Sequence, residues 1–164
     1  MSAPRAAVIT VSTSRARDGG ADESGPALSA FAERLGVELV GAEVIPDERE
    51  LIAGRLRWWA DEGGCELILT TGGTGFARSD VTPEATRDVI DREAPGLAEA
   101  MREASRAHVR LWMVSRGVAG TRGRTLIVNF PGRPEAIEQA GAGVAEAIPH
   151  ALRLLAGERP HNAH

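Results

Sequence analysis

The sequence predicts a single α/β domain in which a mostly parallel sheet is covered by helices on both faces. Short apolar runs alternate with longer amphipathic segments, which is the pattern of repeated strand–helix–strand units. Several of these runs are apolar throughout, as is typical of strands buried on both sides. The length of 164 residues suits one domain with its own core. We expect this domain to span residues 1–157 and residues 158–164 to form a disordered tail.

In the first half of the chain, apolar runs rich in β-branched residues predict strands at 6–11, 37–45 and 66–71. The amphipathic segments around the second run predict helices over 24–35 and 47–62. Ser24 is a suitable cap for the earlier helix, Pro26 lies in its first turn and Gly36 ends it. The polar segment 12–23 is expected to be a loop.

In the second half, prolines mark the starts of helices predicted from 83, over 95–107 and over 134–155. Gly141 and Gly143 weaken the last of these helices, and Pro149 is expected to kink it. Strands are predicted at 111–114 and 125–128, on either side of a turn rich in glycine and arginine.

The carboxyl ends of the predicted strands carry polar or glycine-rich residues. The strands end at Ser12, at Pro46-Asp47, at Gly72–Gly75 and at Asn129. Ligands bind at this edge in parallel α/β folds. The sequence therefore predicts a ligand site built from four separate segments at this edge.

The segment 70–86, TTGGTGFARSDVTPEAT, is the sharpest of these signals. Three glycines after an apolar strand allow successive N–H groups to point at one anion. Asp80 beside such a phosphate loop is suited to hold Mg²⁺, which prefers carboxylates, phosphate oxygens and water. The alternative is a plain glycine turn with Asp80 capping the next helix. The loop is not a Walker A loop, because no Gly-Lys-Ser/Thr closes it. It is not a dinucleotide fingerprint either, because Arg78 stands where the third glycine belongs.

Three other positions at this edge have a functional and a structural interpretation. Asp47 is a second candidate acid, or an ordinary helix cap. Ser115-Arg116-Gly117 could bind phosphate through hydroxyl, guanidinium and backbone. Asn129, in the segment Asn129-Phe130-Pro131-Gly132, could contact a ligand or satisfy a turn.

The composition excludes several other functions. The net charge of −4 does not support nucleic-acid binding. No segment has the length or apolarity of a signal peptide or membrane span. A lone cysteine, Cys65, indicates a reducing compartment, so we expect a cytoplasmic protein. The four histidines show no metal-ligand spacing.

The segments GGTGFARSDVTPEAT, PGLAEAMR and SRGVAGTRGRTLIVNFPGRP resemble the molybdopterin adenylyltransferase family, which includes the N-terminal domain of gephyrin and the plant G domain. The resemblance extends to TVS near the start, DESGP at 22–26 and IPDE at 45–48, and covers nearly the whole chain. It implies a three-layer α/β/α sandwich, a homotrimer, and adenylylation of molybdopterin by Mg-ATP with release of pyrophosphate.

The resemblance also implies roles for individual residues. Asp47 and Asp80 match the family's two essential acidic positions, which organise Mg²⁺ and the triphosphate of ATP. The nucleotide and phosphate loop is matched by Gly72, Gly73, Thr74 and Gly75. Ser115 and Asn129 match the molybdopterin-binding region. We add Ser12, Pro131 and Gly132, at the ends of two strands, to the predicted ligand-binding set.

Two positions depart from the family pattern. Ser79 precedes Asp80 where many relatives have arginine, and Thr13 follows Ser12 where relatives often have aspartate. The competing hypothesis is a non-catalytic molybdopterin-binding or scaffold protein of the same pathway. In either case a molybdenum insertase is a candidate partner.

Overall fold

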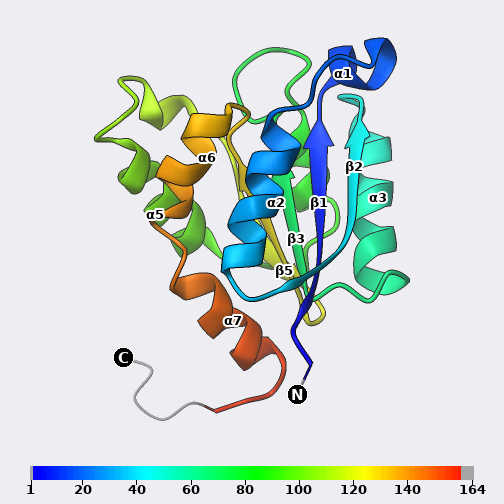
Figure 1. Ribbon diagram of the computed structural model, residues 1–164, viewed down its shortest axis with the longest axis vertical. Coiled ribbons are helices and arrows are strands. Elements are labelled where there is room, and N and C mark those ends of the chain that lie inside the picture. The colour runs from blue at the N-terminus through cyan, green and yellow to red at the C-terminus, as the bar shows by residue number, and fades with distance from the viewer. Residues whose placement is uncertain (1, 160–164) are drawn as a thin grey trace.

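The computed structural model describes residues 2–159, which form three layers with a six-stranded sheet in the middle (Figure 1). The strand order is β2-β1-β3-β6-β5-β4. The strands are β1 (Arg5–Val11), β2 (Glu38–Ile45), β3 (Leu67–Thr71), β4 (Arg92–Glu93), β5 (Ala119–Arg122) and β6 (Thr125–Phe130). The helices are α1 (Thr13–Asp18), α2 (Ser24–Arg34), α3 (Arg49–Asp61), α4 (Thr82–Arg87), α5 (Pro95–Ser105), α6 (Pro134–Gly141), α7 (Ala147–Leu155) and the 3-10 turn η1 (Trp112–Val114).

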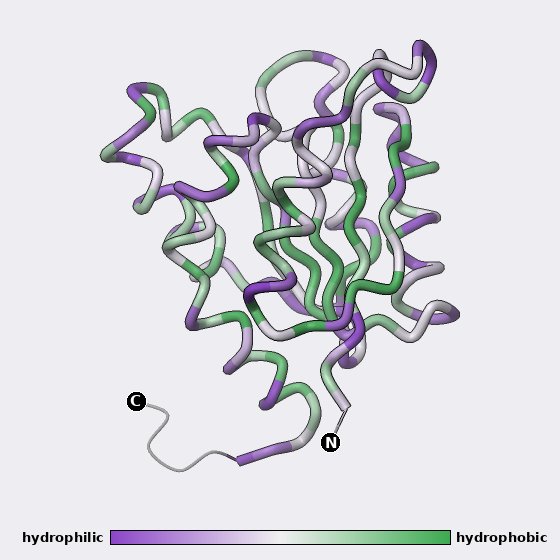
Figure 2. The backbone as a smooth tube through the Cα atoms, in the orientation of Figure 1, coloured by the Kyte–Doolittle hydropathy of each residue, from purple (hydrophilic) through white to green (hydrophobic). Residues whose placement is uncertain are grey.

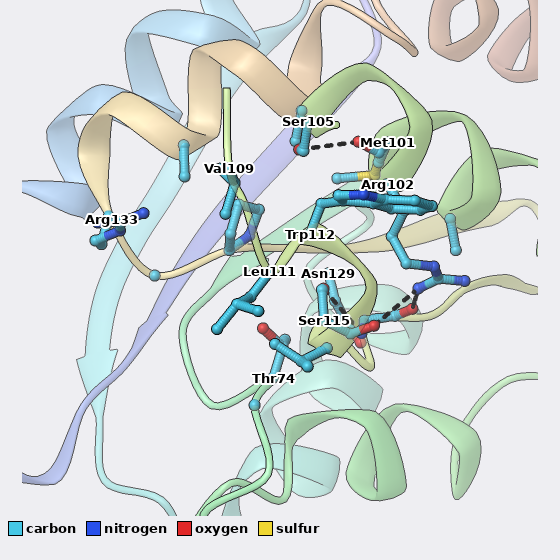
Figure 3. A pocket seen from close by; sticks show the side chains of 18 residues that line it. Thr74, Met101, Arg102, Ser105, Val109, Leu111, Trp112, Ser115, Asn129 and Arg133 are labelled. Atoms are coloured by element: carbon cyan, nitrogen blue, oxygen red, sulfur yellow. Dashed lines mark hydrogen bonds between the residues drawn. The ribbon is translucent and has the colours of Figure 1, made fainter. Parts of the chain in front are cut away.

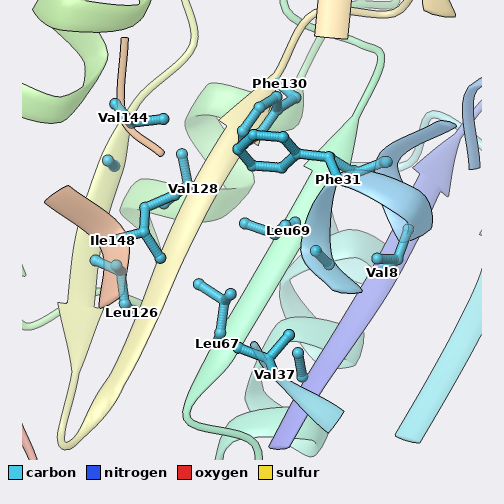
Figure 4. Close-up of a cluster of buried hydrophobic side chains, with 14 of the residues drawn as sticks. Val8, Phe31, Val37, Leu67, Leu69, Leu126, Val128, Phe130, Val144 and Ile148 are labelled. Carbon is cyan, nitrogen blue, oxygen red and sulfur yellow. The ribbon is translucent and has the colours of Figure 1, made fainter. Parts of the chain in front are cut away.

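Alternation along the buried strands divides the core into two clusters. In β1, Ala6 and Val8 face one side, and Ala7, Ile9 and Val11 face the other. Helices α2, α5, α6 and α7 cover the first face, where Phe31 packs on Phe130 with ring centroids 5.2 Å apart (Figure 4). Helices α3 and α4 cover the second face. Figure 2 shows the apolar residues concentrated in the strands, and the predicted three-layer fold is confirmed.

The parallel strands change winding direction at β1. Strand β1 pairs in parallel with β2 on one side and with β3 on the other, and β3 pairs in parallel with β6. Strand β5 runs antiparallel to β6, and β4 antiparallel to β5. The four parallel strands therefore place their carboxyl ends at one edge, at the top of Figure 1, where ligands bind in such sheets.

The predicted loop 12–23 is wrong in part, because it contains helix α1. Ser12 caps this helix by accepting a hydrogen bond from the Arg15 N–H. Gly19, at φ 64°, ends it after six residues. Ser24 is not the cap of α2 either. Its hydroxyl donates to the carbonyl of Gly132, and the Asp22 carboxylate accepts the Gly25 N–H instead, at 2.9 Å.

The prediction of a strand at 111–114 is also wrong. The segment contains η1 and lies at the surface, with Leu111, Met113 and Val114 exposed, and it pairs with no strand among the described residues. The partner of β6 is β5, further along the chain, and Gly123 at φ 56° makes the hairpin turn between them. The short edge strand β4 was not predicted.

The predicted long helix 134–155 is two helices. The break follows Gly141 rather than falling at Pro149, which lies in the first turn of α7. A Cβ on Gly141 would lie 2.5 Å from the Phe31 ring, and one on Gly143 would lie 2.5 Å from the Ala100 carbonyl oxygen. These glycines let the chain turn closely against α2 and α5.

Of the predicted tail 158–164, residues 160–164 lie outside the described residues. Glu158 is half-buried, and its N–H donates to the Arg153 carbonyl. Between residues 2 and 159, none of the helices combines the length and apolarity needed to cross a lipid bilayer.

Candidate functional site at the carboxyl edge of the sheet

The glycine loop after β3 requires glycine at two successive positions. Gly72 and Gly73 have φ angles of 98° and 69°, which favour glycine. A Cβ on Gly72 would lie 2.4 Å from the Val11 carbonyl oxygen, and one on Gly73 would lie 2.3 Å from Thr82 Oγ1. Thr82 Oγ1 also donates to the Gly72 carbonyl at 3.0 Å. The loop therefore lies directly against the end of β1 and the start of α4.

This loop presents four consecutive backbone N–H groups without partners. The Gly72 N–H donates to the Phe130 carbonyl and the Ala77 N–H to Asp80. Within residues 2–159, the N–H groups of 73–76 make no hydrogen bond. Unpaired N–H groups in a concave loop are the usual ligands of a phosphate.

Asp47 lies beside this loop and does not cap α3. Its Oδ2 accepts hydrogen bonds from both the N–H and the hydroxyl of Thr13, at 3.0 and 2.9 Å. The Thr13 hydroxyl in turn accepts the Asp47 N–H at 2.9 Å. The other oxygen, Oδ1, lies 3.1 Å from the point that a Cβ of Gly73 would occupy, and no residue in the described part of the chain bonds it.

Asp80 has a similar arrangement on the other side of the loop. Its Oδ2 accepts the Ala77 N–H at 3.0 Å and lies 2.9 Å from the position of a Cβ on Gly75. Its Oδ1 has no hydrogen-bond partner among residues 2–159. Helix α4 begins after Val81, and none of the described side chains caps it. Asp80 is therefore not the helix cap that the structural interpretation of this motif required.

A cavity of about 180 Å³ opens on the far side of the glycine loop, between α5, η1 and α6 (Figure 3). Its wall is largely apolar and includes Met101 and Trp112. Of the described residues that line it, Arg102 and Arg133 are the charged ones, so the cavity suits an anionic ligand. Six of the predicted site residues line it: Thr74, Gly75, Ser115, Asn129, Pro131 and Gly132.

The two predicted cavity residues Ser115 and Asn129 differ in what they can offer a ligand. Ser115 is half-buried, and its hydroxyl accepts only a long hydrogen bond of 3.5 Å, from the Gly117 N–H. Asn129 is buried, and its amide is fully used. It accepts the Val118 N–H and donates to the hydroxyls of Thr70 and Thr86, each at about 3 Å. The side chain of Asn129 thus joins β3, β6 and α4, while Ser115 remains available.

The remaining predicted residues also gather at this edge. Ser12, at the end of β1, caps α1 next to Asp47. The Pro131 carbonyl accepts the Thr71 hydroxyl at 2.6 Å. A Cβ on Gly132 would lie 3.4 Å from Gly72 Cα. The turn after β6 is therefore packed against the glycine loop.

Sequence reasoning missed two contributors to this site. Thr13, a departure from the family pattern, is the residue that orients Asp47. Arg102, on α5, donates to the carbonyls of Ser115 and Gly117 at 3.4 and 2.9 Å. An arginine inside the matched segment PGLAEAMR was the available signal for Arg102. Nothing in the local sequence indicated that Thr13 would meet a residue 34 positions later.

Fold and site together define a class of protein. It is an α/β domain whose candidate ligand site lies where a parallel sheet changes winding direction, the usual place for ligands in such folds. In this domain Asp47 and Asp80 approach a glycine loop at Gly73 and Gly75, and the same loop lines a cavity that contains two arginines.

Comparison with known proteins identifies the family. The profile of a family described as "Probable molybdopterin binding domain" matches residues 7–150, and the chain belongs to this family of molybdenum cofactor biosynthesis. The molybdopterin adenylyltransferase of Haemophilus influenzae is 41% identical over 83% of this chain and 76% of its own. The crystal structure of the molybdopterin biosynthesis enzyme MoaB from Thermus thermophilus superposes with a TM-score of 0.88. It is 44% identical, over 94% of this chain and 98% of that one.

A longer relative contains a similar domain. The molybdenum cofactor synthesis protein cinnamon of Drosophila melanogaster is 38% identical over 90% of this chain, which spans only 25% of the length of cinnamon.

Proposed function

We propose that this protein adenylylates molybdopterin with Mg-ATP, giving adenylyl-molybdopterin and pyrophosphate, in the cytoplasm. The main support is the glycine loop, whose four N–H groups at 73–76 have no partner among residues 2–159 and which Asp47 and Asp80 approach at Gly73 and Gly75. Each of these carboxylates keeps one oxygen without a partner in the same part of the chain. The relative from Haemophilus influenzae, named molybdopterin adenylyltransferase, supports the same reaction.

The two carboxylates are suited to hold Mg²⁺ on a bound triphosphate. In the described part of the chain, no three His, Cys, Asp or Glu side chains come together as a protein-only metal centre. Magnesium commonly uses one or two carboxylates and completes its shell with phosphate oxygens and water. Oδ1 of Asp47 and Oδ1 of Asp80 would be the protein ligands. The metal would supply charge neutralisation at the triphosphate.

The reaction needs no protein nucleophile. The terminal phosphate of molybdopterin is a monoester with a second pKa of about 6, so it is mostly ionised at neutral pH. One of its oxygens attacks the α-phosphorus of ATP, the bond from that phosphorus to the bridging oxygen breaks, and pyrophosphate leaves. The N–H groups of 73–76 would bind the phosphate oxygens, and the cavity beside them would hold the pterin in line.

Asp80→Asn tests this assignment. The variant keeps the size of the side chain but loses the charge that would bind the metal. We expect molybdopterin-dependent pyrophosphate release to fall by about 100-fold or more. Molybdopterin affinity and melting temperature should change little, because the cavity lies across the loop and Asp80 does not cap α4.

Asp91→Asn is the matched control. The Asp91 carboxylate also accepts one backbone N–H, that of Gly123 at 2.7 Å, but it lies away from the carboxyl edge. The Asp91→Asn variant should retain full activity. A fully active Asp80→Asn enzyme would contradict the catalytic assignment. A wild-type protein that binds molybdopterin but releases no pyrophosphate would instead support the non-catalytic binding protein.

A further inference from the structure

The turn after η1 sends one arginine away from the cavity and into the glycine loop. The backbone N–H of Arg116 donates to the Thr74 carbonyl at 2.8 Å. Its neighbours Ser115 and Gly117 line the cavity on the other side. Arg116 therefore occupies the boundary between the cavity and the glycine loop.

The Arg116 guanidinium makes four hydrogen bonds there. Nε donates to the Gly75 carbonyl at 2.7 Å, and Nη2 donates to the Asp80 carbonyl at 2.8 Å. Because these carbonyls stand at the two ends of the segment 75–80, a single side chain fixes both ends. The remaining two bonds form a fork with Glu84, the first-turn acid of α4, at 2.7 and 3.3 Å.

This geometry is unlike that of a phosphate ligand. Glu84 neutralises Arg116, whose donors are directed at carbonyl and carboxylate oxygens. The same pairing lowers the pKa of Glu84, through its hydrogen bond to Arg116, and raises the pKa of Arg116. The pair thus stays ionised at neutral pH. The phosphate-binding interpretation of Ser115-Arg116-Gly117 does not hold for Arg116.

The same turn is held from the cavity side. Arg102 donates to the carbonyls of Ser115 and Gly117, the residues on either side of Arg116. A ligand that contacts Ser115 would therefore act on a turn that is bonded directly to the segment carrying Asp80.

We propose that Arg116, anchored by Glu84, is a positioning residue that shapes segment 75–80 and couples occupancy of the cavity to binding at the glycine loop. This inference rests on the proposed function in taking the two ligands to be molybdopterin and Mg-ATP. Arg116 contacts neither ligand in this scheme. It acts through the carbonyls of Gly75 and Asp80.

The test measures the coupling itself. Titration calorimetry gives the affinity for an Mg-ATP analogue that cannot be cleaved between its α- and β-phosphates, with and without saturating molybdopterin. We expect molybdopterin to raise this affinity in the wild type by about 5-fold or more, within the usual range of coupling between sites. Arg116→Lys keeps the charge but cannot form the fork. It should bring the ratio close to 1 and lower kcat more than it raises the KM for molybdopterin.

Arg122→Lys is the control for loss of a forked ion pair. Arg122 binds Asp61 at 3.0 and 2.9 Å and also donates to the Val89 carbonyl, away from the site. The Arg122→Lys substitution should leave the coupling ratio unchanged. Glu84→Gln is the second test variant and should also reduce the coupling ratio. It keeps the test decisive if Arg116→Lys fails to fold.

The outcomes separate this inference from the proposed function. If Arg116→Lys and Glu84→Gln both keep the wild-type ratio, the inference is wrong even where adenylylation is intact. A wild type without coupling would also overturn it. The wild type could show coupling that Arg116→Lys abolishes, while the wild type itself releases no pyrophosphate. In that case the inference stands and the proposed reaction fails.

Discussion

The candidate site is best understood from residues whose hydrogen-bonding capacity is divided between structure and ligand. Asp47 and Asp80 each use Oδ2 to hold a backbone N–H, and each Oδ1 has no partner between residues 2 and 159. Asn129 uses its whole amide on β3, α4 and the neighbouring backbone. A family match alone treats these three side chains alike, whereas the structure shows that only the aspartates have capacity left for a ligand.

Ser115→Ala is expected to weaken molybdopterin binding more than Mg-ATP binding. Ser115 lines the cavity, and its hydroxyl makes one long hydrogen bond to the described residues, so the fold should tolerate its loss. Losing one neutral hydrogen bond to the ligand should reduce molybdopterin affinity by about 5- to 10-fold. Calorimetry on the variant and on Ser29→Ala, a substitution on α2 outside the site, provides the measurement. Equal losses for both ligands would count against the assignment.

At the scale of elements, the sequence was sufficient wherever a pattern was long and local. The strands at β1, β2, β3 and β6 and the helices α2, α3 and α5 were predicted to within a few residues. Helix α1 was missed because a carboxylate 34 residues away completes its first turn. The strand prediction for 111–114 was wrong because these apolar residues lie at the surface and around the cavity rather than in a sheet.

The site was predictable to a similar extent. The strand ends and the glycine motif predicted which residues gather at the carboxyl edge of the sheet, and the structure brings them together there. Contacts across the fold decide which side chains remain free for a ligand. The hydrogen bonds of the Asn129 amide and those of the Arg116 guanidinium therefore could not be predicted from the sequence.

Gly73→Ala should destabilise the protein beyond the cost of its backbone conformation. A left-handed φ costs alanine about 1–2 kcal/mol. The Cβ at this position would also collide with Thr82 Oγ1, so we expect about 2–4 kcal/mol in all. Gly19→Ala is the control, since φ is 64° there and the space around it is open. Urea unfolding of both variants gives the comparison, and equal losses would show that the loop can move aside.

The link between the 115–117 turn and α4 should depend on pH. Arg116 lowers the pKa of Glu84 below its ordinary 4.5, so folding favours the ionised carboxylate. Its contribution to stability is therefore complete above the unfolded pKa and is lost as pH falls through the lower folded pKa. At pH 7 the free energy of unfolding of the wild type should exceed that of Glu84→Gln by about 1–2 kcal/mol. This lies between the contributions of exposed and of buried ion pairs.

This difference should begin to shrink below about pH 5 and continue to shrink as the pH falls further. Urea unfolding of the wild type and Glu84→Gln at about pH 7, 5 and 3 measures it. A difference that stays constant over this range would mean that the ion pair does not contribute.

For the whole molecule, we expect a homotrimer. The family resemblance motivates this, together with large apolar side chains on the surface, among them Trp58, Leu111 and Met113. Trp59, by contrast, is half-buried against the second core cluster and donates to Glu43 at 2.9 Å, while its ring meets that of Trp58 edge to face. Light scattering at micromolar concentration should give about three times 17.3 kDa, and a monomer mass would exclude the trimer.

The beginning and the end of the described chain meet at the edge of the sheet opposite the site. Ser2 and Pro4, before β1, line one cavity with Ala156 and Glu158, after α7. A domain joined before Ser2 or after Glu158 would therefore lie near the edge of the sheet opposite the site. It would leave the loops at the carboxyl edge accessible. The cinnamon protein, four times as long as the stretch that matches this chain, contains a similar domain inside a larger polypeptide.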